Sequence, residues 1–212
     1  MELQNDSLGD ETCAHRICFR LSICPAMNLD FHGLPAFVVP GLHGSGDSHW
    51  QTLWQQHCPA LGRIAQDHWD VPSLPVWSQR VADVLASTDG PSVLVAHSFG
   101  CLATVHAALY RDVQIAGALL VAPAEPAKFG VDATLTRHPL PFPSVLVASS
   151  NDPWLHIHRA RSWARLWGSE FVEAGALGHI NADSNLGLWG AGLGLLQRLV
   201  DRLPVCGPAF QA

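Results

Sequence analysis

The chain has 212 residues, of which 48% are hydrophobic and only 14% charged, a balance that excludes a disordered protein. The formal net charge of −6 and the absence of any basic run exclude nucleic acid as an expected partner. No apolar stretch reaches the roughly 18 residues that span a membrane, so we expect no membrane partner either. The six cysteines form no CxxC pair, and we expect them to be free thiols of a reducing compartment, which predicts a cytoplasmic protein.

The composition favours one domain with two short ends. Residues 1–30 mix charged and polar residues with three cysteines and show no period, so we expect an N-terminal extension that is poorly ordered. The alternative is a short extra strand or helix at the domain edge. Residues 31–205 have the length of a single domain, and residues 206–212 are expected to form a C-terminal tail.

Short apolar runs and longer amphipathic segments alternate along the domain. The runs that predict strands are residues 36–39, 63–69, 92–96, 115–121, 144–148 and 170–173. The segments that predict helices are residues 49–57, 76–86, 101–110, 155–167 and 193–203. This alternation predicts an α/β fold in which helices cover both faces of a mostly parallel sheet, a three-layer sandwich. In such sheets the ligand site lies beyond the carboxyl ends of the strands.

One serine stands where a predicted strand passes directly into a helix. Ser98 follows the run 92–96, and a serine at such a sharp turn is a nucleophile elbow. The turn requires small residues two positions before and after the serine, and these are Ala96 and Gly100. The usual pattern has glycine at both, so Ala96 is a mild departure. The competing interpretation is an ordinary serine that caps the helix.

A serine nucleophile needs a base and an acid, which should also follow strands. Asp152 follows the run 144–148, and His179 follows the last short strand. Their order along the chain is nucleophile, acid and base, as in α/β-hydrolase sheets. Asp183 is a second candidate for the acid, although it follows no strand.

His156 and His158 raise the alternative of a metal site. Their spacing of two residues puts them on different faces of a helix, and no third ligand is evident. We therefore expect no metal and no other cofactor.

The oxyanion of an acyl-transfer reaction needs hydrogen-bond donors. The amide of Phe99 is expected to supply one, and the amide of Leu42, in the glycine-rich turn 41–46, the other; His43 is the alternative. A phosphate-binding loop is a weaker interpretation of this turn, because it lacks both the GxGxxG and the P-loop pattern. His43, His97 and Trp154 are expected to line the substrate pocket.

Residues 122–143 form a long connection that we call the rim segment. It is rich in proline, is predicted to be irregular, and carries Glu125, Lys128 and Phe129. A connection of this length at the strand ends is expected to form one edge of the site.

Several stretches together resemble the small α/β-hydrolases related to retinoblastoma-binding protein nine and to bacterial YdeN. They are Val39 to Gly46 with His49-Trp50, Trp69 to Pro72, Leu94 to Cys101, Gly117 to Pro123, Ser150 to Pro153, and Gly178 to Ala182. The resemblance covers about residues 35–200 and implies a compact single-domain serine hydrolase with little or no lid. It implies the same triad of Ser98, Asp152 and His179.

The sequence thus predicts a serine hydrolase that cleaves small acyl esters through an acyl-enzyme. Amide hydrolysis, or acyl transfer to another acceptor on the same triad, is an alternative, and so is a non-catalytic binding protein on a hydrolase fold. The expected partner is a small-molecule ester. The physiological substrate, the acyl-chain preference and the oligomeric state stay open.

Overall fold

The structure is a computed structural model that describes residues 23–24, 27, 29–136 and 138–204. Its centre is a six-stranded sheet in the order β4-β3-β5-β6-β7-β8, with every neighbouring pair parallel. The strands are β3 (Ala36–Val39), β4 (Leu61–Arg63), β5 (Ser92–His97), β6 (Ile115–Val121), β7 (Ser144–Ala148) and β8 (Glu170–Glu173). Four of the predicted strands have the expected bounds, and β5 extends one residue beyond its prediction.

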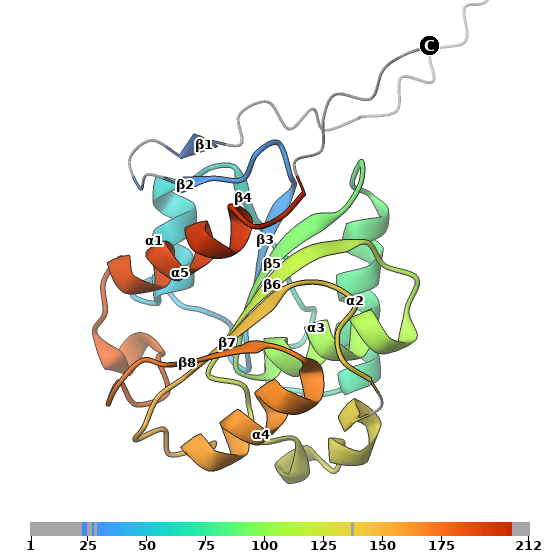
Figure 1. The fold of residues 1–212 in the computed structure, drawn as a ribbon, viewed down its shortest axis with the longest axis vertical. Coiled ribbons are helices and arrows are strands. Elements are labelled where there is room, and N and C mark those ends of the chain that lie inside the picture. Colours follow the sequence, from blue (N-terminus) through green and yellow to red (C-terminus); the bar gives the residue numbers. More distant parts are fainter. Residues whose placement is uncertain (1–22, 25–26, 28, 137, 205–212) are drawn as a thin grey trace, which may run out of the picture.

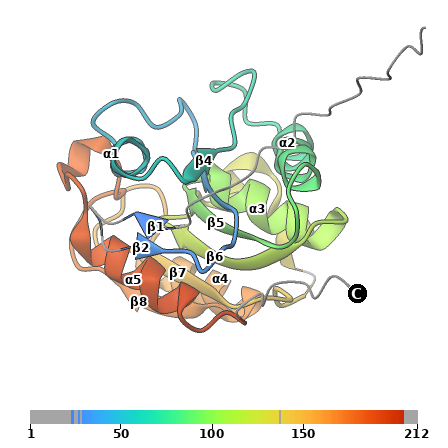
Figure 2. The same ribbon diagram turned by 90° about the horizontal axis from the view of Figure 1, so that it is seen from above.

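Five α-helices cover the sheet on both faces (Figures 1 and 2). They are α1 (Trp50–His57), α2 (Leu74–Ala86), α3 (Phe99–Tyr110), α4 (Ile157–Trp167) and α5 (Gly190–Val200). Helices α2, α3 and α4 share one hydrophobic core with the sheet, and α1 and α5 share the other. The predicted three-layer α/β architecture is confirmed.

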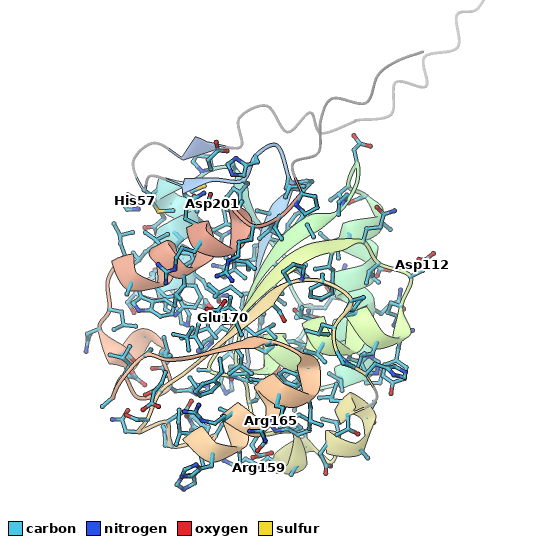
Figure 3. The ribbon with its side chains drawn as sticks, viewed as in Figure 1. His57, Asp112, Arg159, Arg165, Glu170 and Asp201 are labelled. Atoms are coloured by element: carbon cyan, nitrogen blue, oxygen red, sulfur yellow. The ribbon has the colours of Figure 1, made fainter. Side chains whose placement is uncertain are left out.

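The central strand β5 shows why the sheet needs two covering layers. Its residues are all buried, with Leu94 and Ala96 in one core and Val93 and Val95 in the other. Successive side chains of a strand point to opposite faces, so a strand whose four inner residues are all apolar must bury both faces. Charged side chains such as those of Asp112, Arg165 and Asp201 are exposed instead (Figure 3).

The predicted strand at residues 63–69 is wrong in its position. The strand β4 lies earlier, at Leu61–Arg63, and pairs with β3. Gly62 makes this pairing possible, because a Cβ at that position would lie 2.6 Å from the Phe37 ring. Glycine is unfavourable in strands in general, so the sequence pattern predicts a strand that begins after Gly62.

The last helix also begins earlier than predicted, at Gly190 rather than residue 193, and ends at Val200 rather than residue 203. Its glycines lower the intrinsic helix propensity and hide its start. Gly192 has a packing reason, because a Cβ there would overlap the Trp189 ring.

Part of the expected N-terminal extension packs on the domain. The strands β1 (Ile23–Cys24) and β2 (Leu29–Asp30) pair antiparallel, and Met27 and Leu29 are buried in the core beside α5. Packing of the domain therefore begins before residue 31. The other residues of the expected extension, and its C-terminal counterpart at 206–212, lie outside the described residues.

The cysteines differ from the expected set of free thiols. Cys58 is disulfide-bonded, whereas Cys101 is free and buried. A disulfide joins cysteines whose Cβ atoms the fold brings to about 4 Å, and sequence spacing alone does not show this. In the described part of the chain, no helix is long and apolar enough to cross a membrane.

Candidate active site

Ser98 lies at the predicted elbow, between the end of β5 and the first residue of α3. Its backbone has φ 53° and ψ −122°, a strained combination that only glycine adopts freely. The neighbouring chain comes so close that a Cβ on Gly100 would overlap the Val39 carbonyl oxygen, and one on Gly41 would lie 2.7 Å from Ser98 Cβ. Ala96 is accommodated and fully buried. The elbow therefore holds the hydroxyl beyond the sheet edge.

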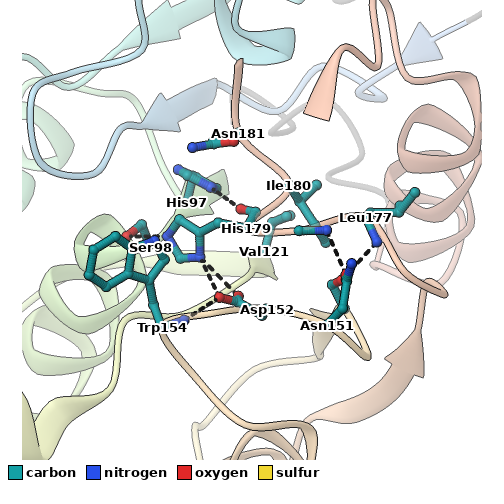
Figure 4. A network of polar contacts seen from close by, with 12 residues as sticks. His97, Ser98, Val121, Asn151, Asp152, Trp154, Leu177, His179, Ile180 and Asn181 are labelled. Carbon is teal, nitrogen blue, oxygen red and sulfur yellow. Dashed lines mark hydrogen bonds and ion pairs between the residues drawn. The ribbon is translucent and has the colours of Figure 1, made fainter. Parts of the chain in front are cut away.

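The two other predicted residues meet Ser98 in a hydrogen-bonded chain (Figure 4). His179 Nε2 lies 2.9 Å from Ser98 Oγ, and His179 Nδ1 lies 2.9 and 3.0 Å from the two carboxylate oxygens of Asp152. A carboxylate only accepts hydrogen bonds, so Nδ1 carries the proton and the Nε2 lone pair faces the hydroxyl. The Trp154 amide donates to Asp152 Oδ1 at 2.8 Å and orients the carboxylate. This arrangement can remove a proton from Ser98.

The loops that carry the acid and the base are bonded to each other. Asn151 Oδ1 accepts hydrogen bonds from Ser149 Oγ at 2.8 Å and from the Gly178 amide at 2.7 Å. Ser149 Oγ in turn accepts from the Leu177 amide at 2.8 Å. Neither Ser149 nor Asn151 is predictable as a site residue from the sequence, because Ser-Ser-Asn before Asp-Pro is typical of any turn. These bonds fix the distance between Asp152 and His179.

His179 is also held from the opposite side. His97 Nε2 donates to the His179 carbonyl at 3.0 Å, and Trp50 Nε1 donates to the Ile180 carbonyl at 2.8 Å. Burial lowers the pKa of His97 well below its usual value, so the ring is neutral near pH 7. His97 lines the cavity as expected, and it has this further contact, which its position beside Ser98 in the sequence did not indicate.

Two backbone amides beside Ser98 are free to bind an oxyanion. Among the described residues, the amides of Leu42 and Phe99 have no hydrogen-bond partner, whereas the His43 amide donates to the Trp69 carbonyl at 2.8 Å. The missing Cβ of Gly41 would lie 3.3 Å from the Phe99 nitrogen, so the turn passes close to the start of α3. The geometry favours Leu42 over His43 as the second donor.

A cavity of about 390 Å³ opens above these groups. His43, His97 and Trp154 line it, as expected, together with His49 and Asn181, which sequence reasoning did not assign to the pocket. The rim segment contributes as well, but it is not wholly irregular. It contains the 3₁₀ helices η2 (Pro126–Phe129) and η3 (Asp132–Thr136).

His49 is a buried polar group of this cavity wall. Its Nδ1 accepts a hydrogen bond from the Gln51 amide at 3.2 Å and caps α1, so its proton is on Nε2. Nε2 has no partner among the described residues. Burial, with smaller effects of Arg63 and His179, lowers the pKa of His49 to about 4.

This pKa predicts a pH dependence of folding. Between pH 6.5 and 4 the unfolded chain protonates His49 and the folded chain does not, so stability is complete above pH 6.5 and falls as the pH is lowered. Each such group contributes a slope of about 1.4 kcal/mol per pH unit. Urea denaturation at several pH values should show a shallower slope for His49→Gln. His57→Gln, at the exposed end of α1, is the matched control; a slope for His49→Gln no shallower than the slope for His57→Gln would contradict the prediction.

The alternative site residues are not part of this arrangement. Asp183 interacts with Asn181 instead: its backbone amide donates to Asn181 Oδ1 at 3.1 Å, and its carboxylate accepts from Asn181 Nδ2 at 3.3 Å. His156 is the residue before α4, and His158 lies within that helix. In the described ranges, no group of three or more His, Cys, Asp or Glu side chains is placed to hold a metal ion.

The sheet, the elbow and the Ser-His-Asp arrangement define the α/β-hydrolase class of fold. The model of the family described as serine hydrolase matches residues 36–198. The chain therefore belongs to the serine hydrolase family.

Solved structures agree with this assignment. A YdeN-like hydrolase of Pectobacterium atrosepticum is 40% identical, with a TM-score of 0.77 over 81% of this chain and 93% of its own. The ydeN gene product of B. subtilis is 16% identical, with a TM-score of 0.66 over 79% and 98%. Est1E of Butyrivibrio proteoclasticus, solved with ferulic acid bound, is 14% identical, with a TM-score of 0.60 over 79% and 89%. None of the curated proteins searched matches the chain. The predicted relation to YdeN is confirmed.

Proposed function

We propose that this serine hydrolase is a carboxylesterase that cleaves small acyl esters through a covalent acyl-enzyme on Ser98. The observation that carries the proposal is the unbroken hydrogen-bonded chain from Ser98 Oγ through His179 to Asp152. Esterases among the solved structures of similar fold, such as RhEst1 of Rhodococcus and Est1E, support ester bonds as the substrate class.

Acylation follows from the positions of the protons. His179 Nε2 takes the hydroxyl proton as Ser98 Oγ attacks the ester carbonyl. Asp152 keeps the proton of His179 on Nδ1 and stabilises the imidazolium that forms. The amides of Leu42 and Phe99 hold the negative oxygen of the tetrahedral intermediate. His179 then returns the proton to the departing alcohol.

Deacylation uses the same groups in the reverse direction. Water enters after the alcohol has left, and His179 removes a proton from it as it attacks the acyl carbonyl. The second tetrahedral intermediate collapses, Ser98 Oγ regains its proton, and the carboxylic acid leaves. A cavity of about 390 Å³ accommodates a small acyl group.

A fluorophosphonate probe tests the proposal directly. The probe reacts with activated serines, and mass spectrometry of the digested protein should locate one adduct, on the peptide that contains Ser98. Hydrolysis of a short-chain 4-nitrophenyl ester, measured beside it, should be lost in proportion to labelling. An unlabelled but folded protein, or an adduct on another serine, would overturn the proposal.

A further inference from the structure

The cavity wall contains two charged residues among the described ones, Glu125 and Lys128, both from the rim segment. Lys128 is the only lysine of the chain. Its Nζ lies 4.9 Å from the centre of the Trp154 ring, over the aromatic face. Within the described part of the chain, no carboxylate forms an ion pair with it.

The carboxylate of Glu125, by contrast, forms an ion pair. Arg159 of α4 donates to both of its carboxylate oxygens, at 2.8 and 3.0 Å. The hydrogen bonds from Arg159 lower the pKa of Glu125, and its side chain is only 14% exposed. The negative charge of the wall is therefore compensated and the positive charge is not. A ligand in this cavity meets a free cation, on a protein whose net charge would otherwise repel anions.

Lys128 lines the same cavity as Ser98. Phe129, the next residue of η2, packs against Phe99 with ring centres 4.8 Å apart, and the Phe99 amide faces the acyl oxygen in the proposed mechanism. The Trp154 ring lies between Lys128 and the catalytic base, since its centre is 6.3 Å from the centre of the His179 ring. A ligand bonded to Ser98 can therefore extend along this wall toward Lys128 Nζ, because both residues line the same cavity.

We propose that Lys128 selects esters whose short apolar acyl chain ends in a carboxylate, the monoesters of dicarboxylic acids. The apolar part of the chain contacts Trp154 and Phe129, and the carboxylate accepts a charge-assisted hydrogen bond from Lys128 Nζ. This inference rests on the proposed esterase function and defines its substrate class.

The test compares two esters of equal chain length, mono-4-nitrophenyl glutarate and 4-nitrophenyl pentanoate. The wild-type protein should prefer the glutarate, and Lys128→Gln should lower its kcat/KM by roughly tenfold, mainly through KM. The kcat/KM for the pentanoate should change much less, because its chain ends in a methyl group that forms no hydrogen bond with Lys128. Lys128→Arg should retain the preference, and added salt should weaken it, because the rim is exposed to solvent.

Two variants on α4 separate this role from a general effect of charge (Figure 3). Arg159→Gln releases Glu125 to pair with Lys128 and should reduce the glutarate preference in the same direction. Arg165→Gln removes an exposed cation of the same helix and should leave kcat/KM unchanged for both esters. If the wild type and Lys128→Gln hydrolyse both esters with the same ratio of kcat/KM values, this inference is overturned and the proposed function is not. Failure to hydrolyse either ester would overturn the proposed function, and this inference with it.

Discussion

Replacing Ser98 with alanine should lower kcat for short-chain esters by roughly 10⁶-fold, the scale seen when a serine hydrolase loses its nucleophile. The hydroxyl is placed to attack, since His179 Nε2 is hydrogen-bonded to it. Steady-state assays with a 4-nitrophenyl ester, corrected for spontaneous hydrolysis, measure the loss.

Alanine keeps the Cβ and the strained φ of 53°, so the fold and the melting temperature should be retained. Ser98→Gly relieves that strain and should be equally inactive but more stable, by about 1 kcal/mol. Ser150→Ala, on an exposed serine just after β7, is the matched control and should keep wild-type activity. More than a few per cent of wild-type turnover in Ser98→Ala would show that another residue is the nucleophile.

Asp152→Asn should lower kcat by about 10⁴-fold, as the equivalent change does in another serine hydrolase. The reason lies in the contacts of the carboxylate. The Trp154 amide donates to Oδ1, so an asparagine must point its oxygen there and its NH₂ group toward His179 Nδ1. Nδ1 then accepts, the ring proton moves to Nε2, and the base has no lone pair for the Ser98 hydroxyl.

Asp183→Asn is the control, because it makes the same chemical change four residues beyond His179, on an exposed side chain in the 3₁₀ helix Ala182–Ser184. It should leave kcat within about twofold of the wild type, since among the described residues Asp183 forms hydrogen bonds with Asn181 and none with the imidazole of His179. A large loss of kcat in Asp183→Asn, with activity kept in Asp152→Asn, would show that Asp183 and not Asp152 is the acid of the triad. Circular dichroism of both variants should match the wild type.

Much of the fold could be predicted because a buried parallel sheet leaves a strong signal. Strands such as Ile115–Val121 are apolar at nearly every position, so their bounds were found to the residue. Glycine obscured two of the elements whose bounds were wrong. Gly62 in β4 and Gly192 in α5 are unfavourable by propensity, and each is explained by an aromatic ring that occupies the place of its side chain.

The sequence by itself determined which residues meet, because Ser98, Asp152 and His179 each follow a strand and parallel strands end at one edge. It did not show what holds them there. The bonds from Asn151, Trp50 and His97 to the His179 loop join residues between 27 and 130 positions apart.

Only the tertiary structure decided the finer choices at the site. It gave the His43 amide a partner in Trp69 and left the Leu42 amide without one among the described residues. It also paired Glu125 with Arg159 while Lys128 stayed on the open face of Trp154. The physical reason is the same in each case. Hydrogen bonds and ion pairs depend on distances of a few ångströms between segments far apart in the chain, and no local pattern encodes those distances.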